Sequence, residues 1–253
     1  PSTRPAIDAA TDFQRLESAR FVGDVVVRLQ GQRLRAERLD VGFRADAAEE
    51  TLEALLERAS ASGGVRLTDD DGRLACERMD LVFDRTPTGE PYPRELVALG
   101  RAELRRGQAR VRGNRVEATM QAAPLDAPPG SPAFVIRSLD VTEAAELLDP
   151  DNRVAARGER LSARFEQLSR LTTAFVAGTP TAWARLQADD YVVRGERIDL
   201  DRAAQLLVVD GPSRMTLPSQ RSLQGAPRAA GSRVLVTASR SLRIDGRGNT
   251  VEF

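Results

Sequence analysis

The sequence predicts an all-β protein, a long antiparallel β-jellyroll whose bent strands give the sheet a V shape. Three observations support this fold class. A segment of about ten residues recurs along the chain, each copy alternates apolar and polar residues, and the alternation changes phase at the same place in each copy. Alternation with a period of two is typical of a strand with one buried face.

The repeat is clearest in residues 34–43, LRAERLDVGF, and residues 74–83, LACERMDLVF, which match at an offset of 40 residues. More divergent copies occupy residues 111–120, 156–165, 193–200 and 236–245. We therefore expect residues 1–253 to form a single repetitive domain of about six repeats, each 37–45 residues long. We also expect the domain as a whole to be truncated at both ends.

In each of the first five copies, a small residue is followed three positions later by an apolar one. The pairs are Ala36 and Leu39, Cys76 and Met79, Gly113 and Val116, Gly158 and Leu161, and Gly195 and Ile198. An odd step would turn the second half of a regular strand toward the wrong face of the sheet. One extra residue, as in a β-bulge or a corner, restores the apolar face. We therefore expect every strand to bend at this step, which leaves the sheet V-shaped.

Turn-forming residues precede each of the first five copies and separate it from an alternating run upstream. They lie at residues 30–32, 69–72, 106–108, 150–152 and 188–190. The chain is thus predicted to be a series of antiparallel hairpins.

Two segments depart from this pattern. In residues 46–60, DAAEETLEALLERAS, Leu52, Leu55 and Leu56 stand at helical spacing and Asp46 is a suitable N-cap. We expect a short inserted helix there. Residues 121–138 are rich in Pro and Ala and predict an irregular connection.

Composition excludes several kinds of chemistry. The 253 residues include no His, no Lys and one Cys, which excludes a His-based triad, a His metal site, a Schiff-base lysine and an internal disulfide. Positive and negative residues balance at 37 each, so no basic excess indicates a nucleic-acid partner. No pair of carboxylates or serines stands out from the repeat. We expect a protein that is not an enzyme, with no catalytic residues, cofactor or metal.

In each of the first five copies, an arginine follows the small residue by two positions, and it has two interpretations. These arginines are Arg38, Arg78, Arg115, Arg160 and Arg197. They belong either to a solvated outer ladder of ion pairs or to a column that contacts lipid phosphates; we favour the first. The small residues also have two interpretations, because they let the sheet walls approach and leave room for an apolar guest.

The pattern V-x-G-x-V-x-V, a turn, and L-x-A-x-x-L-x-V-x-F resembles the OstA-like family of lipopolysaccharide-transport proteins. The matching residues are Val22, Gly23, Val25, Val27, Leu34, Ala36, Leu39, Val41 and Phe43, and residues 191–211 and 234–245 show the same pattern. The resemblance covers most of residues 20–253. It implies a V-shaped jellyroll in the periplasm or cell envelope, whose apolar interior receives acyl chains and whose open ends join similar domains by strand addition. It also implies that any membrane anchor lies in a segment outside this sequence.

Two functions follow as hypotheses. The first is non-catalytic binding or transport of a lipid such as lipopolysaccharide, with acyl chains held inside at about 0.8 kcal/mol per buried methylene. Its expected partners are the lipid and other β-jellyroll domains that pair through edge strands. The alternative is a structural β-solenoid or cell-surface scaffold with a dry core. The expected lipid-binding residues of the interior are Leu34, Leu39, Val41, Phe43, Met79, Leu81, Phe83, Val116, Leu161, Phe165, Ile198 and Leu200.

Overall fold

A computed structural model describes residues 17–29, 31–44, 56–70, 72–124, 134–166, 170–188, 191–218, 233–247 and 250–252. These residues form seventeen antiparallel strands of one sheet and no helix, which confirms the predicted all-β class. The strands are β1 (Ser18–Leu29), β2 (Gln32–Phe43), β3 (Leu56–Thr68), β4 (Gly72–Arg85), β5 (Pro91–Arg106), β6 (Ala109–Ala122), β7 (Phe134–Asp149), β8 (Val154–Glu166), β9 (Arg170–Ala177), β10 (Ala184–Ala188), β11 (Tyr191–Gly195), β12 (Arg197–Asp201), β13 (Leu206–Asp210), β14 (Ser213–Pro218), β15 (Arg233–Ala238), β16 (Ser241–Asp245) and β17 (Thr250–Glu252).

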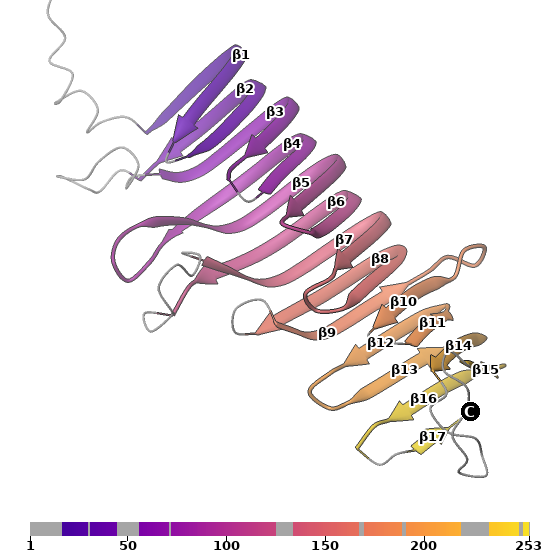
Figure 1. The fold of residues 1–253 in the computed structure, drawn as a ribbon. Helices are drawn as coiled ribbons and strands as arrows, with labels where there is room; N and C mark the ends of the chain where they lie inside the picture. The colour runs from indigo at the N-terminus through magenta and orange to yellow at the C-terminus, as the bar shows by residue number, and fades with distance from the viewer. Residues whose placement is uncertain are drawn as a thin grey trace, which may run out of the picture.

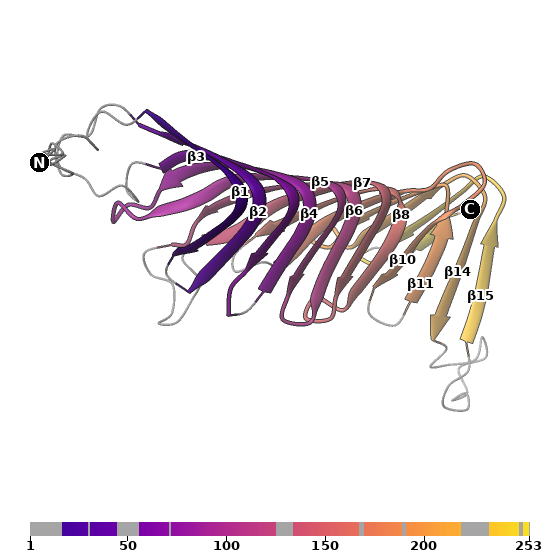
Figure 2. The same ribbon diagram turned by 90° about the horizontal axis from the view of Figure 1, so that it is seen from above.

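The strands stack side by side from β1 at one end of the molecule to β17 at the other (Figure 1). Strands β1–β8 are long and each bends near its middle, so that they appear as nested arches in Figure 2. Beyond β8 the bend divides each long strand into two short ones, for example β11 and β12, which meet at Glu196. The predicted bends and the V-shaped sheet are therefore present.

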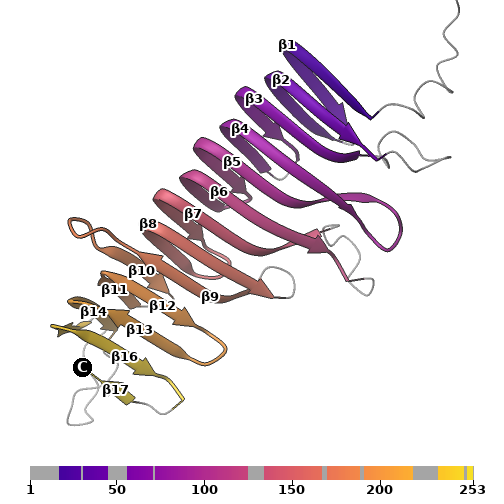
Figure 3. The ribbon, with the colours of Figure 1, turned by 180° about the vertical axis from the view of Figure 1, so that it is seen from behind.

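The limbs on the two sides of the bend form two facing walls. The first wall consists of β9, β12, β13 and β16 together with the matching limbs of β1–β8. The second wall contains β10, β11, β14 and β15 with the other limbs. Figure 3 shows the two sets of short strands separating at the C-terminal end.

One apolar row runs along the inner face of the first wall through eleven strands. Each residue of the row pairs directly with the next. The row consists of Leu39, Ala61, Met79, Ala98, Val116, Val141, Leu161, Val176, Ile198, Val209 and Leu242, and none is more than 3% exposed. The residues that follow the predicted phase change therefore face a shared interior.

A two-residue bulge on each odd-numbered long strand shapes the corner. In β3, Gly63 and Gly64 together oppose the single residue Glu77 of β4, and their φ angles are 82° and 63°. Glycine adopts such angles at little cost, and a Cβ on Gly63 would lie 2.5 Å from the Cβ of Glu37. The matching bulges lie at residues 23–24, 100–101 and 143–144. The extra residue thus belongs to the strand beside each recognised copy.

The predicted helix is wrong where the structure describes it. Leu56 begins β3 and pairs with Phe43, and residues 56–60 are strand; the rest of the segment, residues 46–55, lies outside the described residues. The spacing of apolar residues in a short segment does not by itself distinguish a helix from a strand. Here β2 and β4 supply hydrogen-bonding partners on both sides of β3, which favours the strand.

The predicted connection at residues 121–138 is also partly wrong, because β6 continues to Ala122 and β7 begins at Phe134. The five predicted hairpin turns are confirmed, since each lies between two paired strands.

Candidate functional site

An apolar groove lies between the two walls in the N-terminal half of the molecule. Its volume is about 580 Å³, and strands β1–β7 contribute its lining. The lining is apolar except at residues 32, 69, 72, 73, 105 and 106, which lie at or beside three hairpin turns. A groove of this size falls in the range of small-ligand sites, about 300–1,000 Å³.

Seven of the twelve residues predicted to line the interior line this groove. They are Leu34, Leu39, Val41, Phe43, Met79, Leu81 and Phe83. The other five lie where the walls pack against each other, one on β6 beside the groove and four on β8 and β12. They are Val116, Leu161, Phe165, Ile198 and Leu200, and they are at most 7% exposed. The structure therefore divides the predicted set into an open part and a packed part, and lipid binding at either stays a prediction.

Several groove residues were missed from the sequence because the prediction used only the recognised copies, the first four of which became β2, β4, β6 and β8. Those on odd-numbered strands include Leu67, Leu96, Leu104 and Ile136. Leu56 was assigned to a helix and Phe134 to an irregular connection. The alternation of apolar residues in the runs upstream of each turn is the signal that would have found the first four.

The interior is packed differently at the two ends of the molecule. Ala59 and Ala118 line the groove, and both belong to the inner face of the first wall. At the other end, their counterparts in the same row, Ala163 and Ala174, are equally small and buried, and Leu161, Leu186 and Ile198 are fully buried beside them. The interior thus changes from an open groove to a packed core along the molecule.

The two rims of the groove differ in chemistry. The rim of the second wall carries Arg73, Arg105 and Arg106, whereas the rim of the first wall carries Phe43, Phe83, Pro93 and Phe134. One side of the groove therefore offers positive charge and the other offers apolar rings.

Glu103 holds the basic rim in place. It accepts a 2.8 Å hydrogen bond from Nε of Arg112 and pairs with Arg105 and, at 3.8 Å, with Arg73. Burial raises the pKa of Glu103, but the hydrogen bonds from Arg112 and Arg105 outweigh burial and hold this pKa below its usual range.

Four of the five outer arginines beside the bend form ion pairs, mainly along their own strands and not across strands as the favoured interpretation predicted, and Arg160 forms none within the described residues. Arg38, Arg78 and Arg197 donate to the carboxylate two residues along their own strands, at 2.7, 3.0 and 2.8 Å. Arg115 pairs with Glu117 in the same way. Hydrogen bonding to Asp80 and to Asp199 raises the pKa of Arg78 and of Arg197, respectively.

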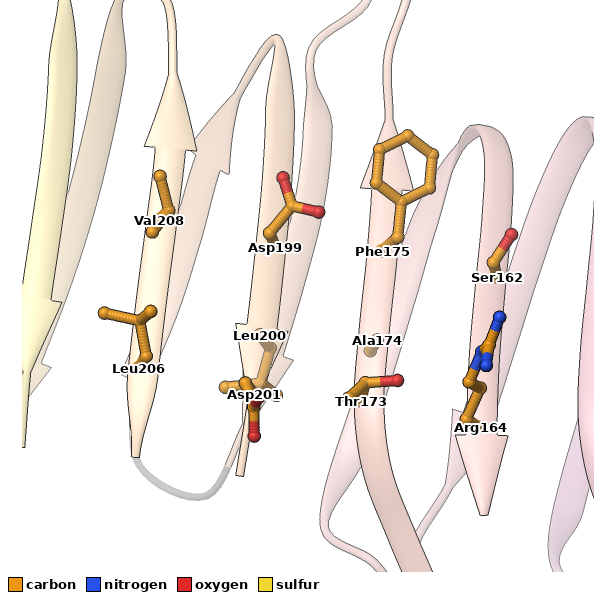
Figure 4. Close-up of a pocket in the computed structure, with 10 residues that line it drawn as sticks. All are labelled: Ser162, Arg164, Thr173, Ala174, Phe175, Asp199, Leu200, Asp201, Leu206 and Val208. Atoms are coloured by element: carbon orange, nitrogen blue, oxygen red, sulfur yellow. The ribbon is translucent and has the colours of Figure 1, made fainter. Parts of the chain in front are cut away.

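A second depression lies on the outer face of the first wall, across β8, β9, β12 and β13 (Figure 4). Its volume is about 400 Å³. Its polar groups already have neighbours, since Ser162 donates to Asp140 and Asp199 pairs with Arg197. Arg197 also lies 5.0 Å from the centre of the Phe175 ring.

Cys76 is a buried corner residue, and burial raises the pKa of its thiol to about 11. A protonated, buried thiol is a poor nucleophile. Among the described residues, no three His, Cys, Asp or Glu side chains gather as a metal site. The described part of the chain also contains no helix long and apolar enough to cross a membrane.

No protein-family model and no curated protein matches the chain. Among solved structures, the chain is similar to LptH of Pseudomonas aeruginosa, described as the LptA homologous periplasmic component of the conserved lipopolysaccharide transport device. The sequences are 12% identical over an alignment that covers 82% of this chain and 94% of LptH, with a TM-score of 0.22.

Proposed function

We propose that this protein binds the acyl chains of a lipid in the groove between its walls and acts as a non-catalytic carrier or bridge in the cell envelope. The observation that carries the proposal is the apolar groove of about 580 Å³, which is open to solvent at its rims. Val41, Leu81 and Phe83 are only half-buried there. Exposed apolar surface favours an apolar occupant, at about 25 cal/mol per Å² removed from water.

The rims give the lipid an orientation. Acyl chains lie between the walls, and an anionic head group, such as a phosphate of a lipopolysaccharide-like lipid, lies beside Arg106. Arginine suits this role because its planar guanidinium donates two parallel hydrogen bonds to a phosphate. The aromatic rim contacts the chains where they leave the groove.

The end of the sheet at β1 extends the proposal to a partner. Among the described strands, β1 pairs only with β2. Phe21, which pairs with Leu39 of the inner row, is 49% exposed, and Val27 is 36% exposed. A second β-jellyroll that pairs with β1 would cover these residues and lengthen the groove, which is why we assign an edge-pairing partner to this end.

A dry structural scaffold is the second candidate, and the packed C-terminal half favours it. Leu161, Val176, Ile198 and Val209 are fully buried against protein alone. If the whole interior closes in solution as this half does, the molecule is a scaffold and takes no lipid.

Blocking the groove tests the proposal. Ala59 is a half-buried lining residue, so Ala59→Trp fills the groove without leaving a cavity. Val82→Trp is the matched control, because Val82 lies one residue from Leu81 on the outer face of β4. The measurements are lipid co-purified with each variant, by mass spectrometry, and the affinity for a fluorescent fatty acid.

We expect the wild type and Val82→Trp to retain lipid and Ala59→Trp to lose it, with at least a tenfold loss of affinity for the fluorescent fatty acid. A wild type that purifies without lipid and does not bind the probe would support the dry scaffold. Equal loss in both variants would show that the groove is not the site.

A further inference from the structure

A run of arginines crosses the outer face of the second wall in the C-terminal half. Arg157 pairs directly with Arg185, Arg185 with Arg194, and Arg194 with Arg214, and all four side chains are exposed. Neighbouring strands lie about 4.8 Å apart, so the run places four positive charges along roughly 14 Å. Like charges directly opposite each other destabilise a sheet.

Most of this charge lacks an internal partner. Further toward the N-terminus, the same row contains Glu103 and Glu146 between its arginines, and Glu146 pairs with Arg157 at 3.4 Å. Within the described part of the chain, Arg185, Arg194 and Arg214 form no ion pair or hydrogen bond with a side chain. The fold therefore keeps a repulsive row that an external anion would relieve.

Apolar side chains gather beside the same row. Apart from those of the edge strand β1, the exposed large hydrophobic residues of the described chain are Leu148, Trp183 and Leu235, at 40%, 38% and 64% exposure. Leu148 and Leu235 lie two residues along their strands from the arginine row and on its face of the sheet. Trp183 precedes Arg185 by two residues. Positive charge and two exposed apolar side chains thus share one face of the sheet, and the exposed Trp183 adjoins the row in the chain.

We propose that this face, formed by Arg185, Arg194, Arg214, Leu148, Trp183 and Leu235, docks on a membrane surface that contains anionic lipids. A row of guanidinium groups matches a layer of lipid phosphates. Trp and Leu enter the interfacial region beneath them, where Trp is favoured. An acidic protein would satisfy the arginines but does not by itself account for the neighbouring apolar groups. The face lies outside the groove, so the inference does not depend on what the groove holds.

The experiment uses vesicles and the natural tryptophan. Trp183 is the only tryptophan in the chain, and it does not line the groove. With vesicles of phosphatidylcholine and phosphatidylglycerol in equal amounts, we expect co-sedimentation, a blue shift of Trp183 emission and quenching by brominated acyl chains. Vesicles of phosphatidylcholine alone should produce none of these effects.

Two triple variants distinguish the effect of this face from the effect of the protein's net charge. Arg185→Gln, Arg194→Gln and Arg214→Gln together should weaken vesicle binding about 100-fold, since each cation near an anionic surface contributes about fivefold. The matched control is Arg38→Gln, Arg78→Gln and Arg115→Gln, which removes the same charge from the first wall and should change binding less than threefold. Circular dichroism checks that both variants remain folded.

Three results would overturn the proposal. The first is a wild type that does not bind the anionic vesicles. The second is an equal loss of binding in the two triple variants, or binding that leaves Trp183 emission unchanged. The third is binding to polyglutamate beads without any response to vesicles, which would assign the face to an acidic protein.

Discussion

Val141 places a methyl group where Gly113 would carry a Cβ atom. Gly113 is the small corner residue of β6, and Val141 belongs to the inner row on the adjacent strand β7. Gly195 has the same relationship with Val209, and a Cβ on Gly158 would lie 2.9 Å from Cγ1 of Val176. At Gly113 and Gly195 the missing side chain makes room for a valine, whereas at Gly158 it makes room for the carbonyl oxygen of Ala177 as well as for Val176.

The two N-terminal corners solve the same problem differently. Ala36 and Cys76 carry a Cβ there, and the corresponding residues of the inner row are Ala61 and Ala98. A larger corner side chain is therefore accompanied by a smaller side chain on the neighbouring strand. Ala61 and Ala98 lie on strands that contribute to the open groove, whereas Val176 and Val209 lie in the packed part of the interior.

This relationship predicts a compensating pair. Gly113→Ala should lower the free energy of unfolding by about 1–3 kcal/mol through overpacking. Adding Val141→Ala should recover part of that loss, so the double variant is more stable than the sum of the two single effects predicts. Urea denaturation of the four proteins measures the coupling. Strictly additive effects would show that the two residues do not share the space.

The bulge of β7 should be strained. Ala144 has a φ angle of 58°, and its counterpart in β3 is Gly64. A non-glycine residue in this left-handed region costs roughly 1–2 kcal/mol. We expect Ala144→Gly to raise the free energy of unfolding by up to about 1 kcal/mol, measured by urea denaturation. Ala145→Gly, at the adjacent buried position, is the control and should destabilise the protein.

Ser213 is a buried corner residue whose hydroxyl has no hydrogen-bond partner in the described part of the chain. The equivalent residues of other strands include Val65, Ala102 and Ala184. An unpaired buried hydroxyl costs about 1–3 kcal/mol. Ser213→Ala should therefore raise the free energy of unfolding by about 1 kcal/mol. This would appear as a higher midpoint of urea unfolding. A lower midpoint would indicate that the hydroxyl is satisfied in solution.

Cys76 should make stability depend on alkaline pH. Burial raises the pKa of its thiol from 9.0 to about 11. A raised native-state pKa leaves stability unaffected below pH 9 and lowers it as the pH rises toward 11, because the unfolded thiol loses its proton first. Unfolding measured between these values should show a decline of about 2–3 kcal/mol that is absent in Cys76→Ala. In the native protein at pH 8, a thiol reagent should react slowly with Cys76.

Leu81 and Ile198 should separate the open and packed parts of the interior. Ile198 is fully buried, so Ile198→Ala should cost about 2–5 kcal/mol of stability. Leu81 is a half-buried groove residue, so Leu81→Ala should cost less stability but weaken binding of a fluorescent fatty acid up to about tenfold. The reverse pattern would place the lipid in the C-terminal half.

Sequence periodicity predicted the even-numbered strands and their corners well. The three-residue step from Ala36 to Leu39 is visible because it reverses the phase of the alternation. The four-residue step from Ala61 to Val65 in β3 preserves the phase, so the bulge there leaves no periodic signal. For the same reason the odd-numbered strands, and the groove residues that they carry, were largely missed.

The sequence by itself determined that the chain is all-β, where its hairpins turn, and which residues turn inward after each bend, because alternation and turn chemistry are local properties. Only the tertiary structure decided which inward residues line an open groove and which are packed, since that depends on side-chain volumes contributed by adjacent strands. The same holds for the row of Arg185, Arg194 and Arg214, which strand register brings together from three separate segments.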